Sequence, residues 1–136
     1  MAKQVLLQSY VSLSGTDLSS YCSKIELTVE VEDKDTTTFG SGGWKENLGG
    51  LKSGSLALTF KQDVAAAAID SIIWPLLGTV VAFETRLNNA VVGTSNPKFT
   101  GSVLVNSWGP VKGSVGDVAE ADLDMPSSGA ITRATS

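Results

Sequence analysis

Histidine is absent from the 136-residue chain, and cysteine occurs once, at Cys22. The absence of histidine excludes Ser-His-Asp and Cys-His catalysis and nearly all zinc sites with nitrogen ligands. One cysteine cannot form an intramolecular disulfide, and we expect Cys22 to behave as a small, half-buried hydrophobe. An enzyme is therefore the weakest class of function, and we predict no cofactor and no metal site.

Charge is also scarce, because charged residues make up 18% of the chain and no run of Lys or Arg occurs. The net charge is −4, whereas proteins that bind nucleic acids tightly cluster positive charge. An acidic surface past which DNA moves without sticking remains compatible with this composition. The low charge also favours a protein that works within an assembly.

Long apolar runs are missing as well. No segment approaches the roughly 20 apolar residues of a membrane span, and Gln8 and Ser9 interrupt the N-terminal apolar stretch where a signal peptide would continue. We therefore expect a soluble protein without membrane contact. A chain of this length can bury a core by itself, so we predict one domain over residues 1–136.

Alternating apolar and polar residues predict a mainly β fold. The clearest strand is 23–32, in which Ile25, Leu27, Val29 and Val31 share the face expected to point inward. Helical spacing predicts one helix over about 64–76, with Asp63 as its N-cap and Pro75 at its end. The expected fold is an antiparallel β-sandwich or barrel with one flanking α-helix and a long Gly-rich β-hairpin loop, with further strands expected at 4–13, 53–62, 79–87, 98–108 and 114–125.

That loop, residues 35–52, contains five of the fourteen glycines. Its glycines do not form a phosphate-binding motif, and Glu32, Asp33 and Asp35 lack the spacing of a calcium loop. Exposed aromatic and leucine side chains gain nothing from water, so we expect the loop to be buried against another subunit. The predicted contact residues are Phe39, Trp44, Leu48 and Leu51.

Acidic side chains share strand faces at alternate positions, as Glu120, Asp122 and Asp124 do, and as Glu26 and Glu30 do. A solvated strand face does not perturb carboxylate pKa values as acid–base catalysis requires, so we interpret these faces as surface. Tryptophans on a β platform can also bind sugars, and a carbohydrate-binding module that uses Trp44 or Trp108 stays open as an alternative.

The segments DTTTFGSGGWKENLGGLKSGSLALTFKQD, IIWPLLGTVV, SNPKFTGSVLVNSW and GAITRATS, in this order, resemble the tail tube (major tail) proteins of phages with long, non-contractile tails. The likeness runs from about Gly15 to the end of the chain, and TTFGSGGW followed by GLKSGS is its most specific part. The resemblance implies a virion structural protein, assembled in the host bacterial cytoplasm, whose hexameric rings stack into a tail tube.

The resemblance further implies partners and surfaces. The partners are other copies of the chain and other tail proteins, with DNA passing through without adhesion during ejection. An N-terminal arm, about 1–14, and a C-terminal arm, about 126–136, are expected to contact neighbours, the latter through Ile131 and Arg133. Another tail morphogenesis protein, such as a terminator or adaptor, is the alternative within this class. Candidates for an acidic lumen are Glu26, Glu30, Glu84, Glu120, Asp122 and Asp124.

Overall fold

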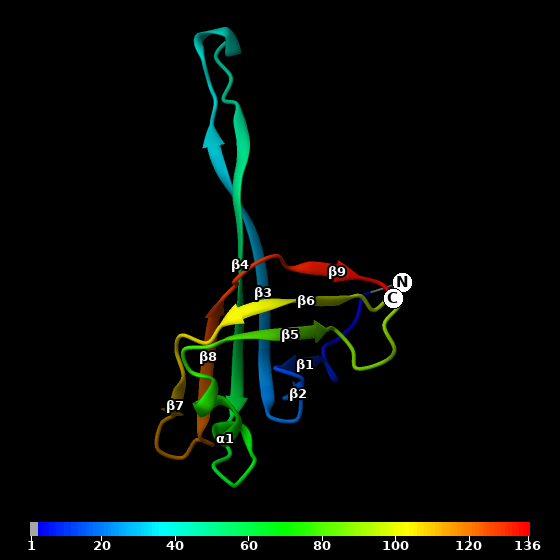
Figure 1. Ribbon diagram of the computed structural model, residues 1–136, viewed down its shortest axis with the longest axis vertical. Coiled ribbons are helices and arrows are strands. Elements are labelled where there is room, and N and C mark those ends of the chain that lie inside the picture. The colour runs from blue at the N-terminus through cyan, green and yellow to red at the C-terminus, as the bar shows by residue number, and fades with distance from the viewer. Residues whose placement is uncertain (1–2) are drawn as a thin grey trace.

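The computed structural model describes residues 3–136 and is mainly β, with 49% strand and 8% helix, so the predicted fold class is confirmed. Two antiparallel sheets pack face to face as a sandwich, and their strands cross in projection (Figure 1). The five-stranded sheet has the order β2-β1-β5-β6-β9, with bounds Thr16–Asp17, Tyr10–Leu13, Val80–Arg86, Lys98–Leu104 and Thr132–Ala134. The four-stranded sheet has the order β3-β4-β8-β7, with bounds Cys22–Asp35, Asn47–Lys61, Glu120–Pro126 and Gly109–Lys112.

The core lies between the two sheets and follows from the alternation in the sequence. On β4, Leu56, Leu58 and Phe60 are fully or almost fully buried, directly opposite Met125, Leu123 and Ala121 of β8. Burying one such large side chain contributes roughly 1.5–3 kcal/mol, so these two strands anchor the sandwich. The other sheet completes the core with Val11, Leu13, Val81, Phe83 and Val103.

The helix is shorter than predicted. α1 spans Ile69–Ile73 and continues as a 3-10 turn over Trp74–Leu76, so the expected start near residue 64 is wrong. The backbone turns at Ala67, which has a left-handed φ of +62°, and Asp63 accepts a hydrogen bond from the Ala65 amide instead of capping a helix. Short helices depend on packing more than on propensity. The helix forms where Ile69 and Ile73 are buried, and the alanine run before it remains a turn.

Other boundaries differ because pattern alone does not guarantee a partner strand. The predicted strand 4–13 is realised only as β1, and Val5 and Leu7 are exposed. Residues 1 and 2 of the predicted N-terminal arm lie outside the described residues. The Gly109–Pro110 break predicted between two strands instead begins the edge strand β7, a position where proline costs no ladder bond. The C-terminal segment forms β9, which pairs with β6.

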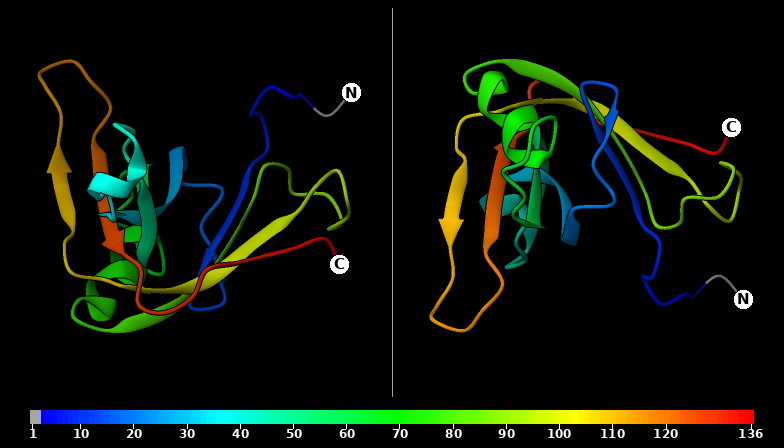
Figure 2. Two further views of the ribbon diagram at one scale, coloured as in Figure 1. Left: turned by 90° about the horizontal axis from the view of Figure 1, so that it is seen from above. Right: turned by 90° about the horizontal axis from the view of Figure 1, so that it is seen from below.

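β3 and β4 form a hairpin far longer than the sheet that carries it. Their pairing runs from Cys22 opposite Phe60 to Asp35 opposite Asn47, and the outer part projects well beyond the sandwich (Figure 1). The loop between the two strands covers only residues 36–46 and is therefore shorter than the predicted loop 35–52. Val29 and Val31 are 54% and 49% exposed, against the prediction that they face the core, because the hairpin leaves the sandwich there. Figure 2 looks along this hairpin and separates the two sheets.

Candidate functional site

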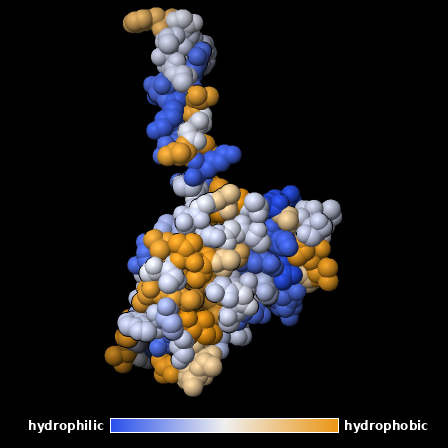
Figure 3. All heavy atoms as spheres, viewed as in Figure 1, coloured by the Kyte–Doolittle hydropathy of each residue, from blue (hydrophilic) through white to orange (hydrophobic). Residues whose placement is uncertain are grey.

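The end of the hairpin presents apolar side chains to solvent. The four predicted contact residues Phe39, Trp44, Leu48 and Leu51 are 109%, 79%, 65% and 75% exposed. Figure 3 shows apolar atoms at this outermost point of the molecule. Their burial against another subunit stays a prediction, since one chain leaves them uncovered. We use the term hairpin tip for residues 36–46.

Hydrogen bonds give the hairpin tip a defined shape. The Thr36 amide donates to the Glu46 carbonyl at 2.9 Å, and the Glu46 amide donates to Thr37 Oγ1 at 2.8 Å. Asp35 accepts from the Thr37 amide at 2.8 Å, and hydrogen bonds from Thr37 lower the pKa of the Asp35 carboxyl. Gly42 and Gly43 then reverse the chain with φ of +67° and +88°. The hairpin tip is therefore an ordered turn whose aromatic side chains point outward.

The C-terminal segment holds the base of the hairpin to the other sheet. The Ser127 amide donates to the Gly54 carbonyl at 2.8 Å, and the Ser127 hydroxyl accepts from the Gly54 amide at 2.9 Å. Ile131 packs between Gly54 of β4 and Gly101 of β6, so it serves its own subunit. Arg133 is exposed on the edge strand β9. A contact of either residue with a neighbouring subunit stays a prediction.

Five of the six predicted lumen residues share the outward face of the four-stranded sheet. On β3 and β8, Glu26 and Asp124 flank Ala57 of β4, while Thr59 lies between Lys24 and Asp122. Glu30 continues the face along β3, and Glu120 begins it on β8. This face, which we call the acidic face, carries the carboxylates Glu26, Glu30, Glu120, Asp122 and Asp124 and the lysines Lys24, Lys61 and Lys112, a net charge of 3 − 5 = −2.

Ion pairs neutralise part of the acidic face. Lys61 lies 3.2 Å from Glu120, and Lys112 lies 2.9 Å from Asp122, which also accepts a hydrogen bond from Thr59 at 3.1 Å. The hydrogen bond from Lys112 is the main cause that lowers the pKa of the Asp122 carboxyl, and Asp122 correspondingly raises the pKa of Lys112. Within residues 3–136, no ion pair engages the carboxylates of Glu26, Glu30 and Asp124.

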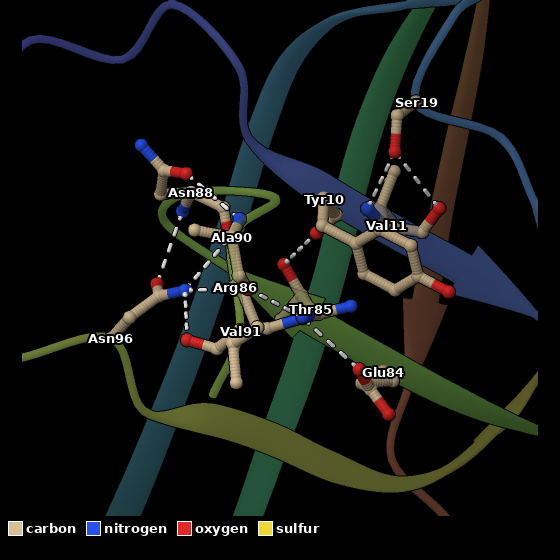
Figure 4. A network of polar contacts seen from close by, with 10 residues as sticks. All are labelled: Tyr10, Val11, Ser19, Glu84, Thr85, Arg86, Asn88, Ala90, Val91 and Asn96. Carbon is tan, nitrogen blue, oxygen red and sulfur yellow. Dashed lines mark hydrogen bonds and ion pairs between the residues drawn. The ribbon is translucent and has the colours of Figure 1, made fainter. Parts of the chain in front are cut away.

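Glu84, the sixth predicted lumen residue, lies on the other sheet. It is on β5, where its carboxylate lies 3.1 Å from Arg86 Nε. The Nε–H does not point at this oxygen, so the contact is an ion pair without a hydrogen bond. Figure 4 shows how Arg86 also covers the Tyr10 ring at 4.1 Å and donates to the Ala90 carbonyl at 2.8 Å. Glu84 therefore belongs to a structural network at the end of the five-stranded sheet.

A second group of exposed apolar side chains was not predicted from the sequence. Val64, Val111, Val115 and Val118 are 75%, 93%, 107% and 67% exposed, and we call them the valine cluster. They lie on the segment after β4 and around the β7–β8 turn, at the end of the molecule opposite the hairpin tip (Figure 1). The predicted strand 114–125 included Val115 and Val118, whereas β8 begins only at Glu120 and both valines lie in the turn before it.

The expected absence of a catalytic or metal site stays a prediction. Residues 3–136 contain no group of three or more His, Cys, Asp or Glu side chains that could hold a metal ion. Cys22 lines an open hollow of about 550 Å³ beside residues 6–9, and burial raises the pKa of its thiol, which makes it a poor nucleophile. None of the helices in residues 3–136 is long and apolar enough to cross a membrane.

One of the two tryptophans proposed for sugar binding is used by the fold. Trp108 packs on Phe60 with ring centroids 6.1 Å apart, and its Nε1 donates to the Asp70 carboxylate at 3.1 Å. This half-buried ring ties α1 to the sandwich. Trp44, the other tryptophan of the carbohydrate-binding alternative, is 79% exposed at the end of a projecting hairpin.

Solved structures share this fold over nearly the whole chain. A chain from the virion of a native gene transfer agent particle aligns with a TM-score of 0.76 at 21% identity, covering 96% of this chain and 98% of that chain. A chain from the tail of an empty gene transfer agent particle, computed with C6 symmetry, aligns with a TM-score of 0.69 at 23% identity and 93% coverage of both. A chain from the 6-fold symmetrised baseplate of the anti-feeding prophage aligns with a TM-score of 0.60 at 15% identity, covering 98% and 97%.

No protein-family model and no curated protein sequence matches the chain. At these identities the structural matches establish a shared fold over nearly the whole chain.

Proposed function

We propose that this protein is a structural subunit of a phage-like tail, which assembles with copies of itself into rings that stack into a tube. One observation carries the proposal: a fold shared over nearly the whole chain with chains from a gene transfer agent virion and tail bears a projecting hairpin whose apolar end is exposed in the described part of the subunit. Monomeric proteins seldom leave such side chains in water. An assembly that repeats along an axis gives every hairpin a partner.

The open edges of the four-stranded sheet support ring formation. β3 and β7 are the outer strands of that sheet, and each presents backbone groups that no strand within residues 3–136 pairs. Unpaired strand edges readily accept another strand. Pairing β3 of one copy with β7 of the next would extend the sheet from subunit to subunit until the ring closes. Six subunits per ring fits the C6 and 6-fold symmetry of the matching particles.

The charge of the acidic face suits the inside of such a ring. Its net charge of −2 per subunit would repeat around the lumen, where like charge opposes adhesion of DNA phosphates. The assignment covers Glu26, Glu30, Glu120, Asp122 and Asp124 and leaves out Glu84, which lies on the other sheet. The tube would then conduct DNA during ejection without holding it.

A terminal or adaptor part of the tail is a second candidate, because one matching chain comes from a baseplate. Such a part forms a single ring, whereas a tube subunit stacks without limit.

Electron microscopy and sedimentation velocity of the purified protein over a range of concentrations test both candidates. We expect rings at moderate concentration and tubes of uniform diameter at high concentration. Rings that never stack would favour the terminal part. A monomer at every concentration would contradict a tail-assembly role altogether.

A further inference from the structure

We propose that the valine cluster is the surface on which the hairpin tip of a second copy docks, so that subunits join end to end along their long axis. The inference rests on the proposed tail function and assigns the receiving residues for the hairpin. It starts from the placement of two exposed apolar groups at opposite ends of one molecule (Figure 1).

The valine cluster is held in a fixed arrangement. Gln62 joins the segments that carry it: its side-chain amide donates to the Pro110 carbonyl at 2.6 Å, and its backbone amide donates to the Ala119 carbonyl at 3.0 Å. The turn between β7 and β8 is closed by a hydrogen bond from the Asp117 amide to the Ser114 carbonyl at 3.0 Å. The four valines therefore sit on segments tied to one another, which preorganises them for a partner.

The two ends complement each other in chemistry. The tip offers the aromatic rings of Phe39 and Trp44, each of which can bury roughly 150–250 Å², and the cluster offers branched aliphatic side chains of matching polarity. Beside Trp44 lies Lys45, while Asp63 and Asp117 adjoin valines of the cluster. Lys45, Asp63 and Asp117 form no ion pair within residues 3–136, whereas Lys61 and Lys112, two bases at the cluster end, are paired with Glu120 and Asp122.

The geometry selects a second copy as the occupant. A tip that projects away from the sandwich cannot reach the opposite end of its own chain (Figure 1). A contact between two different surfaces of identical subunits is heterologous, so each added copy leaves one tip and one cluster free. This pattern generates an open-ended stack. A single tip contact is small, but contacts repeated around a ring reinforce one another through their high effective concentration.

A mixing experiment tests this assignment. The tip variant carries Phe39→Ser with Trp44→Ser, and the cluster variant carries Val115→Ser with Val118→Ser. All four side chains are exposed, so we expect the thermal unfolding midpoints to remain close to that of the unmodified protein. Val91→Ser, at a valine that is 89% exposed on another loop, is the matched control and should stack normally.

Each variant alone should lose stacked species in sedimentation velocity and in micrographs while it retains single rings. Mixed in equal amounts, they should form pairs of rings and nothing longer, because only one kind of junction has both surfaces intact. Lys45→Glu should weaken stacking, and adding Asp117→Lys should restore it at least in part.

A cluster variant that stacks like the unmodified protein would overturn the assignment, and so would tip-to-tip pairing, in which the cluster variant associates without help. In both cases the unmodified protein still forms tubes and the tail function stands. An unmodified protein that forms neither rings nor tubes would instead refute the tail function, so the two failures are distinguishable.

Discussion

At the scale of single residues, Ile131 shows how a short side chain can hold an extended element. It lies between two glycines, one on each sheet, and a methyl group at Gly54 would come 2.5 Å from Ile131 Cδ1 and 2.9 Å from the Thr28 carbonyl oxygen. A methyl group at Gly101 would come 3.0 Å from the Ala130 carbonyl oxygen. Glycine at these positions lets the C-terminal segment close over the root of the hairpin.

Gly54→Ala should therefore destabilise the fold by about 1–3 kcal/mol, the usual cost of overpacking a filled site. Chemical denaturation measures the change in free energy of unfolding. Gly93→Ala is the control, because a methyl group there meets no atom within 4 Å, and it should be neutral. Combining Gly54→Ala with Ile131→Ala should cost less than the sum of the two single changes, since both act at one contact. Full additivity would argue against this packing.

Also at the residue scale, the ion pair between Lys112 and Asp122 predicts a pH dependence. Lys112 lowers the pKa of Asp122 in the folded state, so the stabilisation is present above the ordinary pKa of the carboxyl and is lost as the pH falls through the folded value. Asp122 raises the pKa of Lys112, so the stabilisation from this lysine is present below its ordinary pKa and is lost as the pH rises through the raised value. Both groups are about half exposed, so the effect is small and weakened by salt.

Asp122→Asn should consequently flatten the acid limb of the stability profile. Thermal unfolding midpoints at pH 6 and pH 3 in low salt provide the measurement. Asp124→Asn, on the same strand but without an ion pair, should leave the profile unchanged. Equal flattening by both variants would mean that the pair does not act as described.

At the scale of elements, the sequence was informative wherever a pattern coincided with a partner strand. The alternation of β4 and β8 predicted their buried faces correctly, because both faces meet the opposite sheet. The same alternation misplaced Val29 and Val31, since periodicity does not show where a strand extends beyond the opposite sheet. The alanine run before α1 was misread for a related reason: propensity favours a helix there, but the burial that would fix one begins at Ile69.

Candidate site residues divide in the same way. Local signals in the sequence singled out the aromatic residues of the hairpin tip and the carboxylates that share the acidic face, and their roles as contact and lumen residues stay predictions. It could not separate Glu84 from the others, because assignment to a sheet depends on long-range pairing. The valine cluster was missed, because the pattern assigned Val115 and Val118 to a strand that begins only at Glu120.

The hairpin can be tested as an element. Replacing residues 36–46 by Asn-Gly joins Asp35 to Asn47 through a two-residue turn of the favoured type. Because the loop lies outside the sandwich, we expect an unfolding midpoint equal to or above that of the unmodified protein, together with loss of stacking. Circular dichroism and sedimentation velocity give the two readouts. Loss of the fold would show that the hairpin tip is required for folding of the sandwich.

At the scale of the whole molecule, the proposed lumen predicts how charge governs passage of DNA. Glu26→Lys with Asp124→Lys moves the acidic face from −2 to +2, since each change adds two positive charges to the net value. Tubes of this variant should retain DNA and protect it from nuclease in low salt, and salt should release it. Asp17→Lys with Asp33→Lys, changes of equal charge away from the acidic face, is the control. Equal retention by both variants would contradict the lumen assignment.

The projecting part of the β3–β4 hairpin consists of only two strands, whereas the sandwich below it is cross-braced by two sheets. A two-stranded ribbon twists and bends more easily than a sheet stacked on another sheet. In a tube joined through such ribbons, compliance concentrates between the rings, and each ring behaves as a stiff disc. The tube would then bend at the junctions between rings, and the lumen within each ring would keep its diameter.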